Sequence, residues 1–85
     1  MLSFEDCVAF CDLTEEEIAA IAEHEGIPDL PAAELGAALL SRPDGPARIR
    51  AMILDEIEAA RRHRDALRSA RLKLVLCHFS ECHPG

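Results

Sequence analysis

Apolar residues recur every three or four positions along most of the chain, with charged residues between them. This is the spacing of amphipathic α-helices, which bury one face and expose the other to water. Composition points the same way, because Ala is abundant and has the highest helix propensity. The stretch 72–79 alternates like a strand, but no second strand is available to pair with it, so we expect a helix there as well.

A capping box predicts the start of the most clearly bounded helix. Thr14 precedes Glu17 by three residues, so each side chain can accept a hydrogen bond from the backbone N–H of the other residue. The helix should end near Glu25, because Gly26 can adopt a left-handed conformation and Pro28 cannot continue a helix.

Two further helices are predicted in the first half of the chain. A short one begins at Ser3 and carries Cys7 and Cys11 on its apolar face. Another begins near Pro31, a residue suited to a first helical turn, and ends before the segment SRPDGP. Gly36 within it indicates either a second helix crossing closely or a tolerated surface glycine.

The second half carries one long amphipathic pattern that allows two architectures. From Ala47 onward the apolar stripe of Ile49, Met52, Ile53, Ile57 and Ala60 is helical, and a seven-residue repeat then continues through Ile53, Ala60, Leu67 and Leu74. Either the chain breaks near residues 63–65 and forms two helices, or one helix of about 36 residues spans roughly 54 Å. Typical helix lengths favour the break, although no Gly or Pro marks it.

These patterns predict an all-α fold, a single domain over residues 1–85. We expect a small bundle of four to five short helices, with the merger of the last two into one long helix as the alternative. A chain of this length removes only about 60–65% of its unfolded surface from water, so contact with a partner would add substantially to its stability.

Charge is distributed unevenly along the chain, whose formal net charge is −7. Residues 1–41 contain ten acidic residues and no Lys or Arg, whereas residues 42–73 contain nine basic residues and five acidic ones. An acidic half and a more basic half would pack on each other or pair across a dimer. Docking on a charged partner is the alternative.

An arginine-rich segment within the basic half is the predicted interaction surface. On an unbroken helix one ridge would be formed by Arg61, Arg64, Arg68 and Arg71. The carboxylate of Glu56 would lie nearby in the apolar stripe, and it belongs to the same predicted surface. Pairs four residues apart, Glu58 with Arg62 and Arg61 with Asp65, would neutralise part of this ridge. Nucleic-acid binding is not expected, because the chain is acidic and has three Phe as its sole aromatic residues for stacking.

The C-terminal segment CHFSECHPG is the candidate for metal chemistry. Thiolates and imidazoles are preferred ligands of zinc and iron, and the candidates are Cys77, His78, Cys82 and His83, with Cys7 and Cys11 as further donors. Cys77 and Cys82 diverge by about 140° on a helix, so they converge on one ion only if the last turn frays. The spacing matches no common zinc-finger or ribbon pattern, and we expect no cofactor, with zinc or iron as the alternative.

The string C-x4-C-H resembles the wider-spaced variant of the c-type haem attachment site. The resemblance covers seven residues and would make Cys77 and Cys82 thioether donors and His83 the axial ligand. Such sites belong to exported proteins, and the first residues, MLSFEDCVAF, lack the features of a secretory signal.

Together these features predict an interaction or accessory protein of the cytoplasm. We expect no enzymatic activity, because the sequence contains neither a nucleophile elbow nor a phosphate-binding glycine loop. The expected partner is another protein or a second copy of the chain, and no membrane association is expected. A metal-binding or thiol redox-sensing protein that uses the C-terminal Cys and His residues is the alternative function.

Overall fold

The structure, a computed structural model, describes residues 13–83. This part of the chain contains four helices and no strand: α2 (Glu15–Glu25), α3 (Asp29–Leu40), α4 (Gly45–Arg62) and α5 (Ala66–Cys82). The predicted all-α fold is confirmed. The helix predicted from Ser3, with Cys7 and Cys11 on its apolar face, lies outside the described residues.

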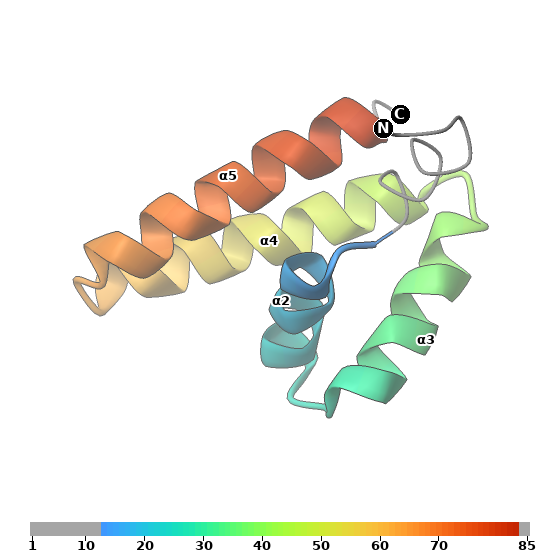
Figure 1. Ribbon diagram of the computed structural model, residues 1–85, viewed down its shortest axis with the longest axis horizontal. Helices are drawn as coiled ribbons and strands as arrows, with labels where there is room; N and C mark the ends of the chain where they lie inside the picture. Colours follow the sequence, from blue (N-terminus) through green and yellow to red (C-terminus); the bar gives the residue numbers. More distant parts are fainter. Residues whose placement is uncertain (1–12, 84–85) are drawn as a thin grey trace, which may run out of the picture.

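The helices form two neighbouring pairs (Figure 1). α4 and α5 run side by side as a long hairpin and make the most extensive helix contact. α2 and α3 are joined by a short turn, and both pack against α4. Of the helix pairs in contact, α2 and α5 pack against each other least closely. None of the helices in residues 13–83 is both long and apolar enough to cross a lipid bilayer.

The predicted capping box defines the start of α2. The Thr14 hydroxyl accepts a hydrogen bond from the Glu17 N–H at 3.1 Å, and the Glu17 carboxylate accepts one from the Thr14 N–H at 2.8 Å. Gly26 ends the helix in the left-handed conformation, with φ 67°, and donates its N–H to the Ala22 carbonyl. Both predicted boundaries of α2 are confirmed.

α3 begins at Asp29, two residues before the predicted Pro31, because Pro28 already takes the extended cap position. Gly36 is buried in this helix. A Cβ atom there would run into the side chains of Leu13 and Ile21, the second of which belongs to α2. Of the two interpretations of Gly36, the close approach of another helix is therefore correct.

The last two helices are separate, so the alternative of one long helix is wrong. α4 ends at Arg62, and Arg64 takes a positive φ of 56°, which reverses the direction of the chain. The Asp65 carboxylate then accepts a hydrogen bond from the Arg68 N–H at 3.1 Å and caps the start of α5. An N-cap aspartate, rather than a Gly or Pro, marks this break.

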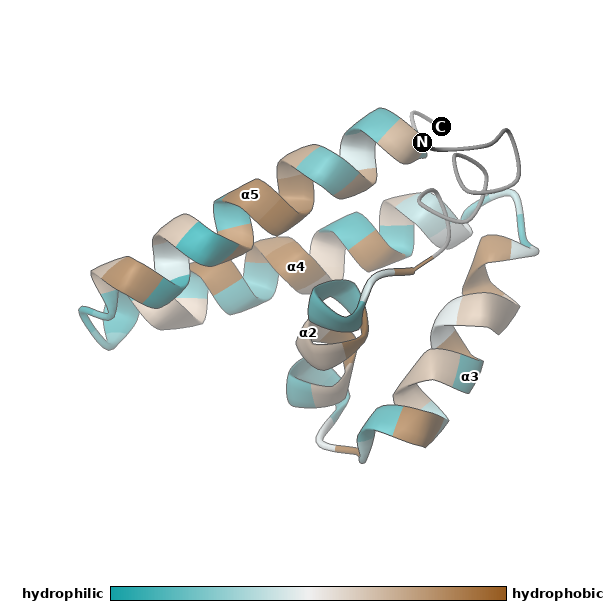
Figure 2. Ribbon diagram, viewed as in Figure 1, coloured by the Kyte–Doolittle hydropathy of each residue, from teal (hydrophilic) through white to brown (hydrophobic). Residues whose placement is uncertain are grey.

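The core is built on the apolar face of α4. Ile49 and Ile53 are fully buried there, and Ile21 from α2 and Phe79 from α5 pack into the same cluster. Figure 2 shows that α5 carries apolar positions along its whole length. It buries one side through Ser69, Leu72, Val75 and Phe79.

The predicted continuation of the apolar stripe into α5 is wrong. Ile53 and Ala60 are buried as expected, but Leu67 is 67% exposed and Leu74 is 73% exposed. The stripe loses its phase because the chain reverses at residues 63–65, so a different side of α5 faces α4. Leu67 and Leu74 therefore lie on the surface of the hairpin and not in line with the buried face of α4.

Two substitutions with opposite effects test the turn between α4 and α5. Arg64→Gly should raise the free energy of unfolding by up to about 1 kcal/mol, because glycine adopts a positive φ without the steric cost that a side chain carries. Asp65→Ala should lower it by about 1 kcal/mol through loss of the N-cap hydrogen bond. Urea denaturation followed by circular dichroism measures both changes. A destabilising Arg64→Gly would indicate a helix that continues through position 64, where glycine costs about 1 kcal/mol.

Candidate functional site

The most exposed large apolar side chains of α5 identify the candidate site. Leu67 and Leu74 are seven residues apart, so they lie on nearly the same side of the helix. Each has more than half of its side chain in water, and neither contributes to the core. Apolar side chains that gather on one face, with polar groups beside them, are typical of protein–protein contact sites.

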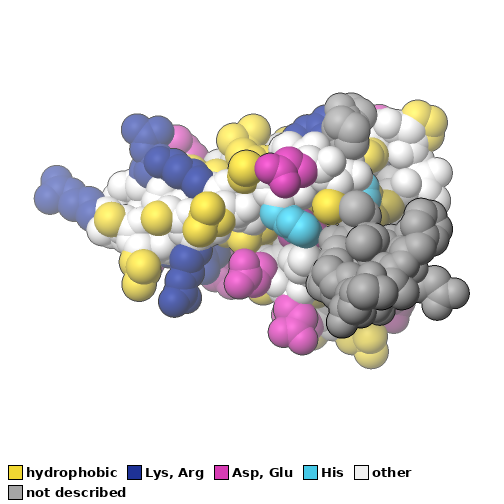
Figure 3. All heavy atoms as spheres, turned by 45° about the horizontal axis from the view of Figure 1, so that its top comes forward, with side chains coloured by type: hydrophobic (Ala, Val, Ile, Leu, Met, Phe, Trp, Pro, Cys, Tyr) yellow, Lys and Arg dark blue, Asp and Glu magenta, His cyan; other side chains and the backbone are white. Residues whose placement is uncertain are grey.

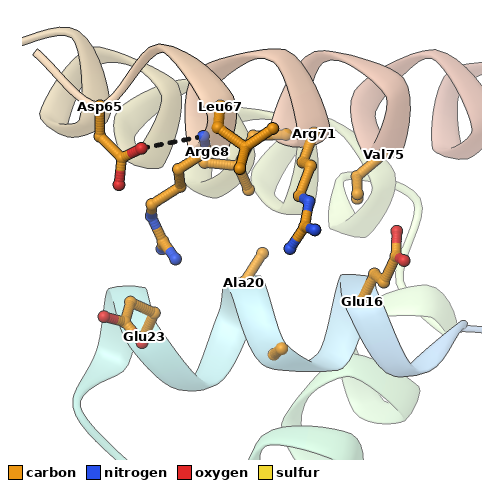
Figure 4. Close-up of a pocket in the computed structure, with 10 residues that line it drawn as sticks. Glu16, Ala20, Glu23, Asp65, Leu67, Arg68, Arg71 and Val75 are labelled. Carbon is orange, nitrogen blue, oxygen red and sulfur yellow. Dashed lines mark hydrogen bonds between the residues drawn. The ribbon is translucent and has the colours of Figure 1, made fainter.

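Both leucines line a groove between α2 and α5. A hollow of about 420 Å³ lies between the two helices, with Leu67 at its edge and Ala20, Leu72 and Val75 in its lining (Figure 4). A second hollow of about 330 Å³ adjoins it, shares Glu16 and Val75 with the first, and is lined by Leu74 and His78. We call these two hollows together the α2–α5 groove.

The two walls of the α2–α5 groove carry opposite charges. Glu15, Glu16 and Glu23 stand on α2, and Arg68 and Arg71 stand on α5. Asp65 also lines one end of the α5 wall, where its carboxylate accepts the Arg68 N–H as the N-cap of α5. Figure 4 shows both arginine side chains extending from α5 toward α2. Arg68 Nη2 also lies 3.3 Å from the Glu56 carboxylate, which is 13% exposed.

The remaining wall charges are not neutralised within the described chain. Across residues 13–83, neither Arg71 nor any of the three glutamates on the α2 wall forms an ion pair. The groove therefore presents an acidic wall and a basic wall above an apolar floor, with charges available to a binding partner.

The arginine ridge predicted from the sequence is only partly present. Because the helix breaks, Arg61 stays on α4, where it forms an ion pair with Glu58 at 3.4 Å, and Arg64 lies in the turn. Of the four ridge arginines, Arg68 and Arg71 alone line the α2–α5 groove. The expected pairs of Glu58 with Arg62 and of Arg61 with Asp65 are replaced by the bond between Arg61 and Glu58. Figure 3 shows Lys and Arg side chains gathered at the end of the molecule where α4 meets α5.

The two halves of the chain pack together, as predicted, but the ion pairs that arginines form within residues 13–83 do not involve the carboxylates of the acidic half. α2 and α3 contact α4 closely. Within the described residues, every Arg ion pair nevertheless uses an acidic residue of the basic half: Arg42–Asp44, Arg48–Asp44, Arg61–Glu58 and Arg68–Glu56. Hydrophobic contact is the main link between the halves, and the contact of His24 with Asp55 also joins them.

The structure separates the C-terminal metal candidates. α5 stays helical through Cys82, so Cys77 and Cys82 point in different directions. Cys77 Sγ lies 3.7 Å from a Glu81 carboxylate oxygen, whereas Cys82 Sγ lies 3.9 Å from His78 Nε2.

His83 does not join Cys82 and His78 in one group of potential ligands. Its ring packs against Phe79 with 4.6 Å between the ring centroids, and its Nε2 atom is buried without a hydrogen bond in the structure. No cluster of three potential ligands occurs in residues 13–83. Cys7 and Cys11 lie outside this range, so metal binding stays a prediction that now depends on Cys82 and His78.

His24 links α2 to α4, a role that the sequence analysis missed. Its Nδ1 lies 2.7 Å from a Glu25 carboxylate oxygen and its Nε2 lies 2.9 Å from an Asp55 carboxylate oxygen. Partial burial disfavours the charged ring, but the hydrogen bonds to Asp55 and Glu25 and the attraction of both carboxylates outweigh it. Together they raise the pKa of His24 above its ordinary value. No local motif signals this contact, because Asp55 is 31 residues away in the sequence.

The raised pKa of His24 predicts the sign of a pH effect. A pKa higher in the folded than in the unfolded state means that His24 stabilises the protein most below its ordinary pKa of about 6.5 and loses this effect as the pH rises through the raised value. We expect His24→Gln to lower the free energy of unfolding by about 0.2–1 kcal/mol near pH 6, with a smaller loss at pH 8.5. Urea denaturation of both proteins across this range measures the difference. A loss that grows as the pH rises would contradict the assigned contact.

No protein-family model, curated protein or solved structure matches this chain. The surface of the molecule is therefore the basis for inferring its function.

Proposed function

We propose that the chain is a protein–protein interaction module that self-associates or docks on a larger protein through the α2–α5 groove. The observation that carries the proposal is the exposure of Leu67 and Leu74 along this groove. Full burial of a leucine side chain contributes about 1.5–3 kcal/mol, so covering both would give a partner a substantial driving force.

The composition of the groove favours binding to a protein surface over catalysis. Three glutamates, an aspartate and two arginines flank an apolar floor, and a partner with apolar anchors and matching charges would satisfy both features. Arginine is enriched at protein interfaces, where its planar head group can bond a carboxylate through two N–H groups. We therefore assign the chain an accessory, non-enzymatic role.

The proposed setting is the cytosol. Cys77 is an exposed thiol outside any disulfide, the state that thiols keep in a reducing compartment. The distinction between self-association and docking on another protein depends on what covers the groove.

Site-specific photo-crosslinking tests the proposed docking surface directly. A benzophenone amino acid in place of Leu74 should yield a discrete adduct on illumination of cells that make the protein, because this position lies at the contact. The matched control is Leu30, which is 72% exposed but lies on α3, away from the α2–α5 groove. Adduct mass is measured by denaturing electrophoresis and mass spectrometry.

The expected result is an adduct from position 74 and none from position 30. Adding Leu67→Gln to the labelled chain should weaken the adduct without unfolding the protein, since changes at exposed sites usually alter stability by less than about 0.5 kcal/mol. Equal labelling from positions 30 and 74, or none from either, would refute the docking surface.

A further inference from the structure

We infer that the α2–α5 groove is covered by a second copy of the chain, related to the first by a two-fold axis that runs along the groove. This inference rests on the proposed function and names the partner. Each copy would set its α5 wall against the α2 wall of the other. The evidence is the arrangement of charged and apolar side chains around the groove.

The charge pattern of the groove is self-complementary about this axis. A half-turn about an axis lying along the groove exchanges its two sides and keeps each residue at the same level along it. The basic wall of one copy, with Arg68 and Arg71, then faces the acidic wall of the other, with Glu16 and Glu23. In a two-fold interface every such contact occurs twice, so both walls of both copies are paired.

The other simple two-fold arrangement is excluded by the same charges. An axis running across the groove would set α5 against α5 of the second copy and α2 against α2. Arginines would then face arginines and glutamates would face glutamates, and like charges brought together at an interface are repulsive. Only the axis along the groove brings opposite charges together.

A second copy also fits the groove better than a partner of uniform charge. A strongly acidic protein or a nucleic acid would be repelled by Glu16 and Glu23, and a strongly basic protein by Arg68 and Arg71. The partner must place negative side chains opposite the arginine wall and positive side chains opposite the glutamate wall. A second copy of this chain, turned about the axis along the groove, does so. Leu67 and Leu74 lie at the same contact, so the dimer would also cover the two most exposed leucines of α5.

Charge reversal followed by mixing tests the inference. Glu16→Arg and Arg71→Glu are made in separate chains, and the dissociation constant of each purified protein is measured by sedimentation equilibrium. Each variant alone places like charges twice in its own dimer, so its dissociation constant should rise at least about tenfold over the wild type. An equimolar mixture should recover the wild-type affinity to within about threefold, because both contacts are attractive in the mixed dimer.

Matched controls separate this effect from general changes in charge. Glu34→Arg on α3 and Lys73→Glu on α5 reverse exposed charges outside the groove, and both should leave the dissociation constant within about twofold of the wild-type value. Thermal unfolding verifies that each variant is folded. If a reversal variant is unfolded, the salt dependence of the wild type serves instead. Its dissociation constant should rise between about 0.05 M and 0.5 M NaCl, because salt screens exposed charges.

Failure of the dimer and failure of the docking function can be told apart. A mixture as weak as its separate components, or a wild type that stays at its monomer mass of 9.3 kDa, overturns the second-copy inference. If position 74 then cross-links to a different protein in cells, the docking function stands with another partner. If position 74 yields no adduct either, both proposals fail.

Discussion

The reversal of the chain at Arg64 and Asp65 is the constraint on which the rest of the structure depends. A residue with positive φ ends α4, and a carboxylate cap starts α5 in the opposite direction. The hairpin brings distant residues together: Arg50 Nη1 donates a hydrogen bond to the His83 carbonyl oxygen at 2.7 Å across 33 residues. Without this turn α5 would extend away from α4, and the groove between α2 and α5 would not exist.

The turn also decides which side of α5 is buried. On α4 the buried positions follow one regular stripe, and Ile49 and Ile53 are fully covered. After the reversal, α5 faces α4 with Leu72 and Phe79, so Leu67 and Leu74 remain in water. The same event that completes the core therefore creates the apolar part of the proposed docking surface. Because α2 meets α5 only lightly, the charged walls stay apart and face the solvent.

The fold was predictable wherever a signal was local. Thr14 and Glu17 define the start of α2 within four residues, and Gly26 defines its end. Gly36 was informative but ambiguous, since the sequence alone does not show which side chains approach it. Asp65 carried an N-cap signal that the seven-residue repeat obscured, because Leu67 and Leu74 fit the repeat while lying outside the core.

The candidate site was predictable only in part. Arg68 and Arg71 were named as surface residues, but their acidic counterparts on α2 are more than 40 positions away in the sequence. Their meeting across a groove depends on tertiary packing, which periodicity does not encode. The contact of His24 with Asp55 is likewise a product of packing. For the C-terminal thiols, the geometry followed from helix periodicity, since an intact last turn keeps Cys77 and Cys82 apart.

Nuclear Overhauser contacts between the two ends of the α4–α5 hairpin test the central claim most directly. In the reduced protein, protons of Arg50 should show contacts with protons of His83, and Arg64 should show the coupling constant of a positive φ. An uninterrupted helix would instead place these two residues about 50 Å apart, at 1.5 Å per residue. Sequential helical contacts running unbroken through residues 62–66, with no contact between positions 50 and 83, would contradict the account.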